Sequence, residues 1–265
     1  MRTLAVIGNL SKDTIDGVGP RVGGAPYHAA RALRLLGGSA RVVARCAEAD
    51  RRALVTPLAA LGVRWDWLPA DRTPAFELDY EGEERRLAVL DSGSPWTADD
   101  VRAIGRAEWI HVGALTRDDF PPDVLELLAR DRRLALDGQA LARPAAHGPV
   151  ELDDGFDPAA LRHVDVLKLS EEEAEALGGE ERVAALGVPE LLLTHGSTGA
   201  SVVAGGVREQ VPVRRIPTDD PTGAGDAFLA AYVWARANGH RPVSAARHAA
   251  VTAARVLELA AIPAV

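Results

Sequence analysis

Apolar residues recur along this chain with two spacings that alternate from one segment to the next. Short continuous apolar runs, such as Leu4–Gly8 and Ala40–Cys46, predict buried strands. Runs in which apolar residues recur every three or four positions predict helices, and Ala25–Leu36 is the first of them. Strands that alternate with helices favour a mostly parallel sheet with helices on both faces. The further strands expected are Trp109–Leu115, Leu134–Asp137, Val166–Leu169 and Leu191–Thr194, and the further helices are Arg51–Leu61, Asp123–Ala129, Glu171–Leu177, Gly223–Ala237 and Val243–Leu259.

One segment departs from this rhythm and predicts a β-hairpin. Between Thr73 and Leu90, apolar residues alternate with polar ones at Phe76, Leu78 and Tyr80, and the alternation resumes after a turn. Such an insertion is expected either as a lid over the open end of the sheet or as an extension of its edge. Because long excursions from a compact domain are often functional, we favour a small lid formed mainly by residues 73–90. Residues 12–22 are a second candidate segment for it.

Length and charge narrow the class of protein. The chain has 265 residues, which fits a single α/β domain over residues 1–265. Acidic residues outnumber basic ones by 38 to 30, and a net charge of −8 repels phosphate backbones, so no nucleic-acid partner is expected. Since no apolar stretch reaches the roughly 18 residues of a membrane span, we expect no membrane partner and a cytoplasmic location. Cys46, the only cysteine, is expected to be a small buried hydrophobe.

The most informative stretch is Asp220–Phe228, in which two glycines open a long apolar helix. Gly223 and Gly225 let the backbone approach a ligand closely, and the unpaired amides of a helix N-terminus bind anions, phosphate especially. Asp226 follows in the first turn. It is either an ordinary first-turn aspartate that balances the helix dipole or a base that accepts a proton from an attacking hydroxyl. As a base, Asp226 is expected to be kept ionised by the dipole and hence to be weak.

Four motifs in order along the chain resemble those of the ribokinase-like (PfkB) carbohydrate kinases. Asp220-x-Thr-Gly-Ala-Gly-Asp226-x-Phe228 is similar to the carboxyl-terminal signature of that family. Gly8 to Asp13 resembles its first-strand Gly-x-x-x-x-Asp, and Gly23–Gly24 resembles its substrate-side glycine pair. Thr194 to Gly199 resembles its nucleotide loop. The resemblance implies a three-layer α/β/α fold with a mostly parallel central sheet and a small hairpin lid.

The same resemblance implies a role for each matching residue. Asp226 would be the catalytic base, with Gly223, Ala224 and Gly225 as the anion hole. Asp13 would bind a pair of substrate hydroxyls with help from Asn9 and Gly24, and a carboxylate suits a vicinal diol. Thr194, Gly196 and Gly199 would line the nucleotide, and Asp220 is a candidate for a monovalent-cation site that would take K⁺. An alternative for Asp13 is a turn residue at the end of a strand.

Two positions depart from the family pattern. The family has Asn-x-x-Glu near its metal and phosphates, whereas this chain has Ser170 and Glu173 there. Ser170 remains a candidate on the nucleotide side and Glu173 a candidate for Mg²⁺ through water, since Mg²⁺ keeps much of its hydration shell. Ser170 to Glu173 also has the pattern of a helix capping box. At the family's sugar-binding Asn stands His28, which is either an exposed first-turn residue or a substrate ligand, so ribose is not the expected substrate.

Residues 136–143 and 166–174 resemble plant-type myo-inositol kinases more than ribokinase, and these relatives also have Ser at the position of Ser170. Gln139 and Arg143 then become candidates for the substrate or phosphate side, with a surface loop as the alternative for Arg143.

We therefore expect an ATP-dependent, Mg²⁺-dependent kinase acting on a small-molecule sugar or cyclic polyol. A nucleoside kinase, or a non-catalytic sugar or nucleotide sensor on the same fold, remains an alternative. Because Phe76, Leu78 and Tyr80 give the hairpin an apolar face that needs cover, a homodimer is a further expectation.

Overall fold

The computed structural model describes residues 3–37, 40–81, 84–218 and 220–260. Within them, nine strands form a central sheet in the order β14-β13-β12-β11-β9-β8-β1-β4-β5. Every neighbouring pair is parallel except β12–β13 and β13–β14. Its strands are β1 (Leu4–Asn9), β4 (Arg41–Ala47), β5 (Arg64–Ala70), β8 (Trp109–Gly113), β9 (Arg133–Asp137), β11 (Val164–Ser170), β12 (Glu190–Thr194), β13 (Ala200–Ala204) and β14 (Val207–Val211).

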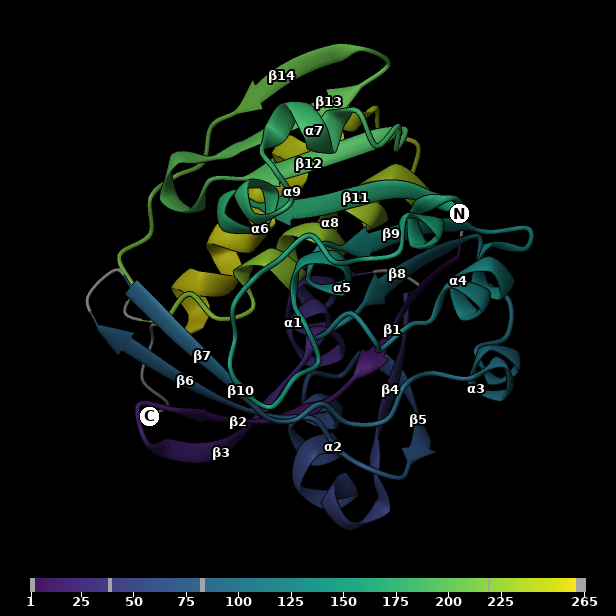
Figure 1. Cartoon of the computed structure of the whole chain (residues 1–265), viewed down its shortest axis with the longest axis vertical. Coiled ribbons are helices and arrows are strands. Elements are labelled where there is room, and N and C mark those ends of the chain that lie inside the picture. The colour runs from purple at the N-terminus through teal and green to yellow at the C-terminus, as the bar shows by residue number, and fades with distance from the viewer. Residues whose placement is uncertain (1–2, 38–39, 82–83, 219, 261–265) are drawn as a thin grey trace.

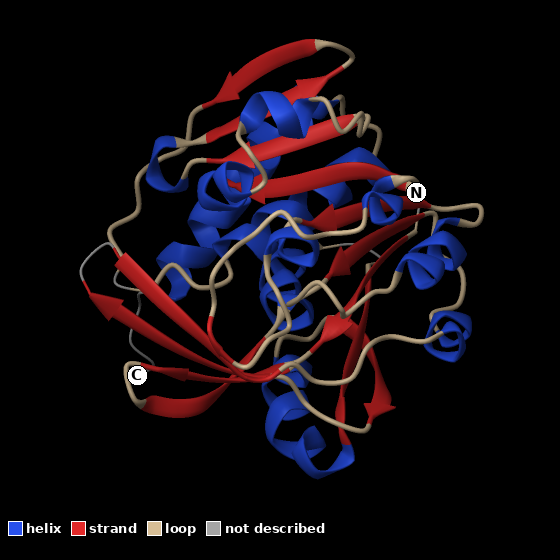
Figure 2. Ribbon diagram, in the orientation of Figure 1, coloured by secondary structure: helices blue, strands red, loops and turns tan. Residues whose placement is uncertain are grey.

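Helices cover both faces of this sheet and complete a three-layer α/β/α arrangement (Figures 1 and 2). One apolar core lies under α1 (Ala25–Leu36), α2 (Arg51–Ala60), α8 (Ala224–Ala237) and α9 (Pro242–Ala260). The other lies under α3 (Ala98–Ala103), α4 (Pro122–Ala129), α5 (Gln139–Ala142), α6 (Glu171–Ala176) and α7 (Glu180–Ala184). The predicted fold class is thus confirmed.

A second, smaller sheet projects from one side of the central sheet (Figure 1). Its order is β10-β7-β6-β2-β3. The predicted hairpin supplies β6 (Ala75–Glu81) and β7 (Glu84–Asp91), although residues 82–83 at its turn lie outside the described residues. The second candidate segment supplies most of β2 (Ser11–Ile15) and β3 (Val18–Gly23), and β10 (Gly148–Pro149) completes the sheet.

The apolar face of the smaller sheet is covered by the chain itself. Phe76 and Leu78 are buried in a cluster with Ile15, Val89 and Leu115, the last of which follows β8. The alternation of the hairpin therefore leaves no free apolar face at these two positions, and the expected homodimer loses the observation on which it rested. A homodimer stays a prediction.

Most predicted elements lie within two residues of the observed ones, and α1 matches its predicted range. Cys46 is buried, as expected. The predictions missed β5, the β13–β14 hairpin and the short helices α3, α5 and α7.

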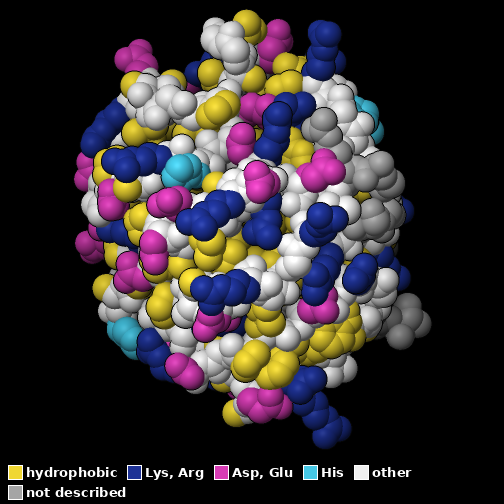
Figure 3. All heavy atoms as spheres, turned by 90° about the vertical axis from the view of Figure 1, so that its right-hand side faces the viewer, with side chains coloured by type: hydrophobic (Ala, Val, Ile, Leu, Met, Phe, Trp, Pro, Cys, Tyr) yellow, Lys and Arg dark blue, Asp and Glu magenta, His cyan; other side chains and the backbone are white. Residues whose placement is uncertain are grey.

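No helix among the described residues is long and apolar enough to span a bilayer. On the face shown in Figure 3, Lys and Arg side chains lie among Asp and Glu side chains.

Candidate active site

The candidate site lies where several parallel strands end. Asn9, Asp137, Ser170 and Thr194 are the last residues of β1, β9, β11 and β12. The carboxyl ends of parallel strands share one edge of a sheet, where open α/β sheets bind their ligands. The N-terminus of α8 points into the same region. Residues of the smaller sheet and of the start of α8 line one cavity there.

Two glycines shape the N-terminus of α8, and both are needed where they stand. Gly223 caps the helix in the left-handed region (φ 80°), and a Cβ there would lie 2.0 Å from Nδ1 of His28. A Cβ on Gly225 would lie 2.9 Å from Nζ of Lys168. Any side chain at either position would therefore displace a neighbour. The first turn of α8 thus presents bare backbone amides, which suits the predicted anion hole.

Asp226 is buried in this first turn, and its charge state differs from the expected one. Burial, reinforced by the charge of Asp137, raises its pKa to about 7, although Lys168 and Arg143 oppose the rise. The expectation that the helix dipole keeps Asp226 ionised as a weak base is therefore wrong. Loss of water and a neighbouring carboxylate outweigh the dipole at this position. A carboxyl group with a pKa near 7 is well matched to accepting a proton at neutral pH.

Next to Asp226 is a small cavity of about 70 Å³, which we call the inner cavity. The predicted substrate residues Asp13, Gly24, His28, Gln139 and Arg143 line it. So do Thr222 and Gly223 from the start of α8, together with Ser11 and apolar residues of the smaller sheet. The structure thus brings five of the six predicted substrate residues to one cavity beside the predicted base.

Several polar atoms around the inner cavity are buried without a hydrogen-bond partner in the described part of the chain. They are Oγ of Ser11, Oδ1 of Asp13 and Nδ1 of His28; Nδ2 of Asn9, a residue that does not line the cavity, is a further one. Burial raises the pKa of Asp13 to about 6, against the opposing effects of Ser11 and Arg143, and burial lowers the pKa of His28 to about 4. The alternative of an exposed His28 is therefore wrong. Buried polar groups are normally satisfied, so these atoms are free to bind the polar groups of a ligand or of water.

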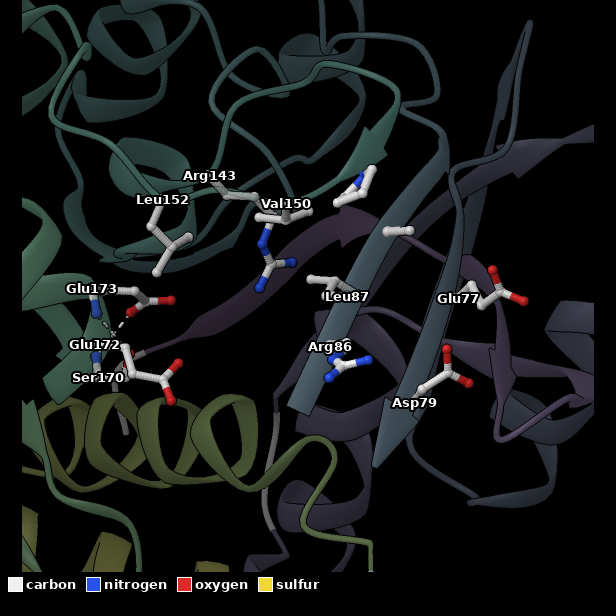
Figure 4. A pocket seen from close by; sticks show the side chains of 12 residues that line it. Glu77, Asp79, Arg86, Leu87, Arg143, Val150, Leu152, Ser170, Glu172 and Glu173 are labelled. Carbon is white, nitrogen blue, oxygen red and sulfur yellow. Dashed lines mark hydrogen bonds between the residues drawn. The ribbon is translucent and has the colours of Figure 1, made fainter. Parts of the chain in front are cut away.

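A larger cavity of about 390 Å³, which we call the outer cavity, lies between β7 and the N-terminus of α6. Leu87 and Arg143 line both cavities, so the two meet there. Figure 4 shows Arg143 pointing from above into the space between β7 and the start of α6. Arg143 is buried, and its Nη1 donates to the carbonyl oxygen of Leu115 at 3.1 Å, so the surface-loop alternative for it is wrong.

Ser170 and Glu173 form the capping box that their spacing predicts, and both line the outer cavity. The amide of Ser170 donates to Oε2 of Glu173 at 2.8 Å, and the amide of Glu173 donates to the Ser170 hydroxyl at 3.2 Å. Among the described residues, no group of three or more His, Cys, Asp or Glu side chains could hold a metal ion. One carboxylate still fits Mg²⁺, which takes its other ligands from water and from substrate phosphates.

The predicted nucleotide loop lines neither of the two cavities. Its Thr194 hydroxyl donates to the carbonyl oxygen of Leu169 at 3.2 Å, and the amide of His195 donates to the carbonyl oxygen of Gly199 at 2.8 Å. Asp220 also lines neither cavity; its Oδ1 accepts from the amide of Thr222 at 3.0 Å. The nucleotide and cation roles of these residues stay predictions.

Sequence reasoning missed two charged residues of the site, Lys168 and Asp137. Nζ of Lys168 lies 3.3 and 3.1 Å from the two carboxylate oxygens of Asp137, and both side chains are buried. A signal was present, because a lysine inside the apolar run Val166–Leu169 must be buried with that strand. Lysine is almost never fully buried unless it is paired.

A helix N-terminus with bare amides, a buried aspartate of raised pKa beside it and a cavity with unsatisfied polar atoms define the site of a phosphotransferase that acts on an alcohol. The comparisons agree with this class. The profile of pfkB family carbohydrate kinases matches residues 9–260, and the chain belongs to that family.

The individual relatives include a curated protein found by sequence and solved structures found by superposition. A fructokinase of Klebsiella pneumoniae is 27% identical over 229 residues, which cover 78% of this chain and 74% of the relative. Among solved structures, a pyrophosphate-dependent kinase of the ribokinase family, complexed with a pyrophosphate analogue and myo-inositol, superposes with a TM-score of 0.85. It is 25% identical, and the match covers 96% of this chain and 95% of the other. A Burkholderia thailandensis nucleoside kinase in complex with inosine, 21% identical with a TM-score of 0.72 and coverage of 95% and 89%, shares the fold.

Proposed function

We propose that this protein phosphorylates one hydroxyl of a sugar or cyclic polyol bound in the inner cavity, with Asp226 as the general base. The observation that carries the proposal is the placement of Asp226 beside Asp13 and His28, whose buried Oδ1 and Nδ1 lack partners among the described residues. A carboxylate accepts hydrogen bonds from two neighbouring hydroxyls, so Asp13 suits a vicinal diol. The solved relative that binds myo-inositol supports a polyol over ribose.

In the proposed reaction the acceptor O–H gives its proton to the Asp226 carboxylate as its oxygen bonds to the terminal phosphorus of the donor. The bond between that phosphorus and the leaving oxygen of the donor breaks, and ADP leaves if the donor is ATP. Backbone amides of Gly223, Ala224 and Gly225 would stabilise the negative charge on the transferring group. With a pKa of about 7, Asp226 is about half ionised at neutral pH before the acceptor binds.

The donor would lie in the outer cavity, which brings Arg86 and Arg143 together with Ser170 and Glu173. The two guanidinium groups suit phosphate oxygens. Mg²⁺, when bound, would neutralise charge on the donor phosphates, and Glu173 would hold it through water. With ATP as donor, Thr194, Gly196 and Gly199 would lie against the nucleoside end, beyond this cavity.

Inorganic pyrophosphate is a second candidate donor, and two observations favour it. The solved relatives with TM-scores of 0.84 and 0.85 are both pyrophosphate-dependent, whereas the nucleoside kinase superposes at 0.72. The predicted nucleotide loop lines neither of the two cavities. A donor without a nucleoside would need only the outer cavity.

The test is a matrix of two donors against a panel of acceptors, read as new phosphomonoester signals by phosphorus-31 NMR. ATP and pyrophosphate, each with Mg²⁺ and with or without K⁺, are offered with myo-inositol, fructose, ribose, glucose, cytidine and adenosine. The proposal expects product from a polyol or sugar with one donor. Product from nucleosides alone would replace it with the nucleoside kinase, and tight polyol binding without product would favour the sensor. A K⁺ requirement would support the cation site at Asp220.

A further inference from the structure

The buried pair formed by Lys168 and Asp137 is unusual in where it lies. Asp137 ends β9, and Lys168 stands directly opposite it on the parallel neighbour β11. Nζ of Lys168 approaches both carboxylate oxygens almost equally, at 3.1 and 3.3 Å. The amide of Gly138 also donates to the carbonyl oxygen of Lys168 at 2.7 Å, which joins the two strand ends. The pair is therefore fixed by the sheet itself.

This pair reaches the first turn of α8. A Cβ on Gly225 would lie 2.9 Å from Nζ and 3.4 Å from Cε of Lys168, so the lysine side chain occupies the space that a larger residue would need. Gly225 directly precedes Asp226. The lysine lines neither cavity and is only 4% exposed, so it is out of reach of bulk water.

Stability alone gives little reason for such a pair. Moving two charges out of water costs about as much as their attraction returns, and an apolar pair of similar size is commonly as stable. Groups whose pKa values are strongly perturbed by burial and by a charged partner cluster at functional sites. The charged groups that act on Asp226 are Asp137 on β9, Lys168 on β11, Arg143 after α5 and Glu173 on α6. Lys168 and Asp137 thus act on it from one place with opposite signs.

We propose that Lys168 and Asp137 are positioning residues for the proposed base: the lysine, held by Asp137 against Gly225, favours the ionised form of Asp226, and Asp137 opposes it. The inference rests on the kinase function proposed above for the role of Asp226, but the placement of the pair does not. Burial lowers the pKa of Lys168, yet Asp137, Glu173 and Asp226 outweigh burial and raise it above its usual value. Lys168 therefore keeps its charge at any pH at which the enzyme works.

Opposite shifts from the two halves of one ion pair are the decisive prediction. In Lys168→Met, the acidic limb of the pH profile of kcat/KM should move to higher pH by about 0.5–1 unit, because a cation near Asp226 is lost. In Asp137→Asn, it should move to lower pH by a similar amount, because an anion is lost. If the pair is purely structural, both variants should be less stable, and the acidic limb should either stay in place or move in the same direction in both. Either of these results would overturn the proposal.

Two further measurements keep the proposal testable if no acceptor is found or if a variant does not fold. The carboxyl carbon of Asp226, assigned in carbon-13 NMR spectra by its disappearance in Asp226→Asn, can be titrated without any turnover. It should show the same two opposite shifts even if no acceptor is found, which separates this inference from the kinase proposal. If Lys168→Met does not fold, the double variant Lys168→Met/Asp137→Asn removes both charges, and its titration should lie nearer the wild type than that of Asp137→Asn.

The matched control is a partly buried ion pair that joins α8 to β12. Arg236 donates from Nε and Nη2 to the carboxylate of Glu190 at 2.9 and 2.5 Å, near the opposite end of the helix. Glu190→Gln and Arg236→Met should lower the melting temperature and leave the titration of Asp226 in place. If these variants moved the titration as far as Lys168→Met does, the effect would be a general loosening of α8, and the proposed role of the pair would be wrong.

Discussion

The two ends of α8 each carry a buried cluster of charged side chains, and the clusters differ in how well they are satisfied. Near the carboxyl end, Glu190 accepts hydrogen bonds from Tyr232 at 2.6 Å and from Arg236. At the amino-terminal end, Asp226 has a raised pKa, and Asp13 and His28 each have a buried polar atom without a partner in the described part of the chain. We infer that the first cluster holds α8 against the sheet, whereas the second is arranged for a ligand.

The largest effect is expected from Asp226→Asn. Loss of the proposed base should lower kcat by about 10²–10⁴-fold, because proton transfer by a positioned side chain contributes that much. Binding of the acceptor should change little, since the amide keeps the size of the carboxyl group. Steady-state rates with the best donor and acceptor pair measure both. A variant with kcat near the wild-type value would remove Asp226 as the base.

At the other end of the helix, Glu190→Ala should act on stability alone. It leaves the partly buried Arg236 without its carboxylate and frees the Tyr232 hydroxyl, so the free energy of unfolding should fall by about 2–4 kcal/mol. Urea unfolding measures the loss, and kcat of the folded fraction should stay at the wild-type value. A selective loss of kcat would contradict the division between the two ends.

Asp13→Asn probes the unsatisfied end directly. Replacing a charged acceptor of two hydroxyl hydrogen bonds should cost about 10–100-fold in kcat/KM for the acceptor, following the 1.5–3 kcal/mol typical of hydrogen bonds to charged groups. The KM of the phosphoryl donor should be unaffected. Ser11→Ala, on the same cavity wall, offers a milder comparison. Equal effects on donor and acceptor would mean that Asp13 supports the lid and does not bind the acceptor.

The activity of the wild type should depend on pH through Asp226. Its pKa of about 7 means that the carboxyl is protonated below pH 7 and cannot accept the proton of the acceptor hydroxyl. We therefore expect kcat/KM to fall about tenfold for each pH unit below 7 and to level off above it. A profile that stays flat down to pH 5 would show that burial does not set the charge of the base.

The smallest effect is expected at the contact between the smaller sheet and α8. The Tyr80 hydroxyl lies 2.8 Å from that of Thr222, directly before the anion hole. Tyr80→Phe removes one neutral hydrogen bond, worth about 0.5–1.5 kcal/mol, so kcat/KM should fall about two- to tenfold. Leu90→Ala, on an exposed position of β7, is the matched control. Equal losses in both variants would mean that the contact does not hold the lid.

Much of the fold could be predicted from sequence, because each core is formed between one face of the sheet and the helices that cover it. This burial requires a recognisable apolar pattern in the strands and in the helices. A continuous apolar run such as Leu4–Gly8 and a helical run such as Ala25–Leu36 each carry their own signal. β5 was missed because it is a half-buried edge strand, in which Trp65 and Trp67 alternate with charged residues. The short helices have too few turns for a period to be visible.

The site was predictable where a motif stands on the chain and unpredictable where three-dimensional burial decides. Asp13 and Asp226 were found, but the charge state of Asp226 was predicted wrongly. Its pKa is raised first by burial and then by the charge of Asp137, which is 89 residues away in sequence, and both causes exist only in the fold. Ser11 has no sequence signal at all. Lys168 had one, an isolated charge within a buried strand, and reading that signal requires a partner that only the sheet register reveals.

The most direct test of the contrast between the two ends of α8 is a pair of melting curves at pH 8. The folded-state pKa of Asp226 lies above its ordinary value of 3.8, so stability falls as pH rises between these two values, and above pH 7 the buried charge carries its full cost. Asp226→Asn removes that cost, and we predict that it melts above the wild type, by about 1–3 kcal/mol in stability, whereas Glu190→Gln melts below it. If Asp226→Asn instead melted below the wild type, Asp226 would be part of the structural support of α8, and the contrast between a structural end and a ligand-binding end would be wrong.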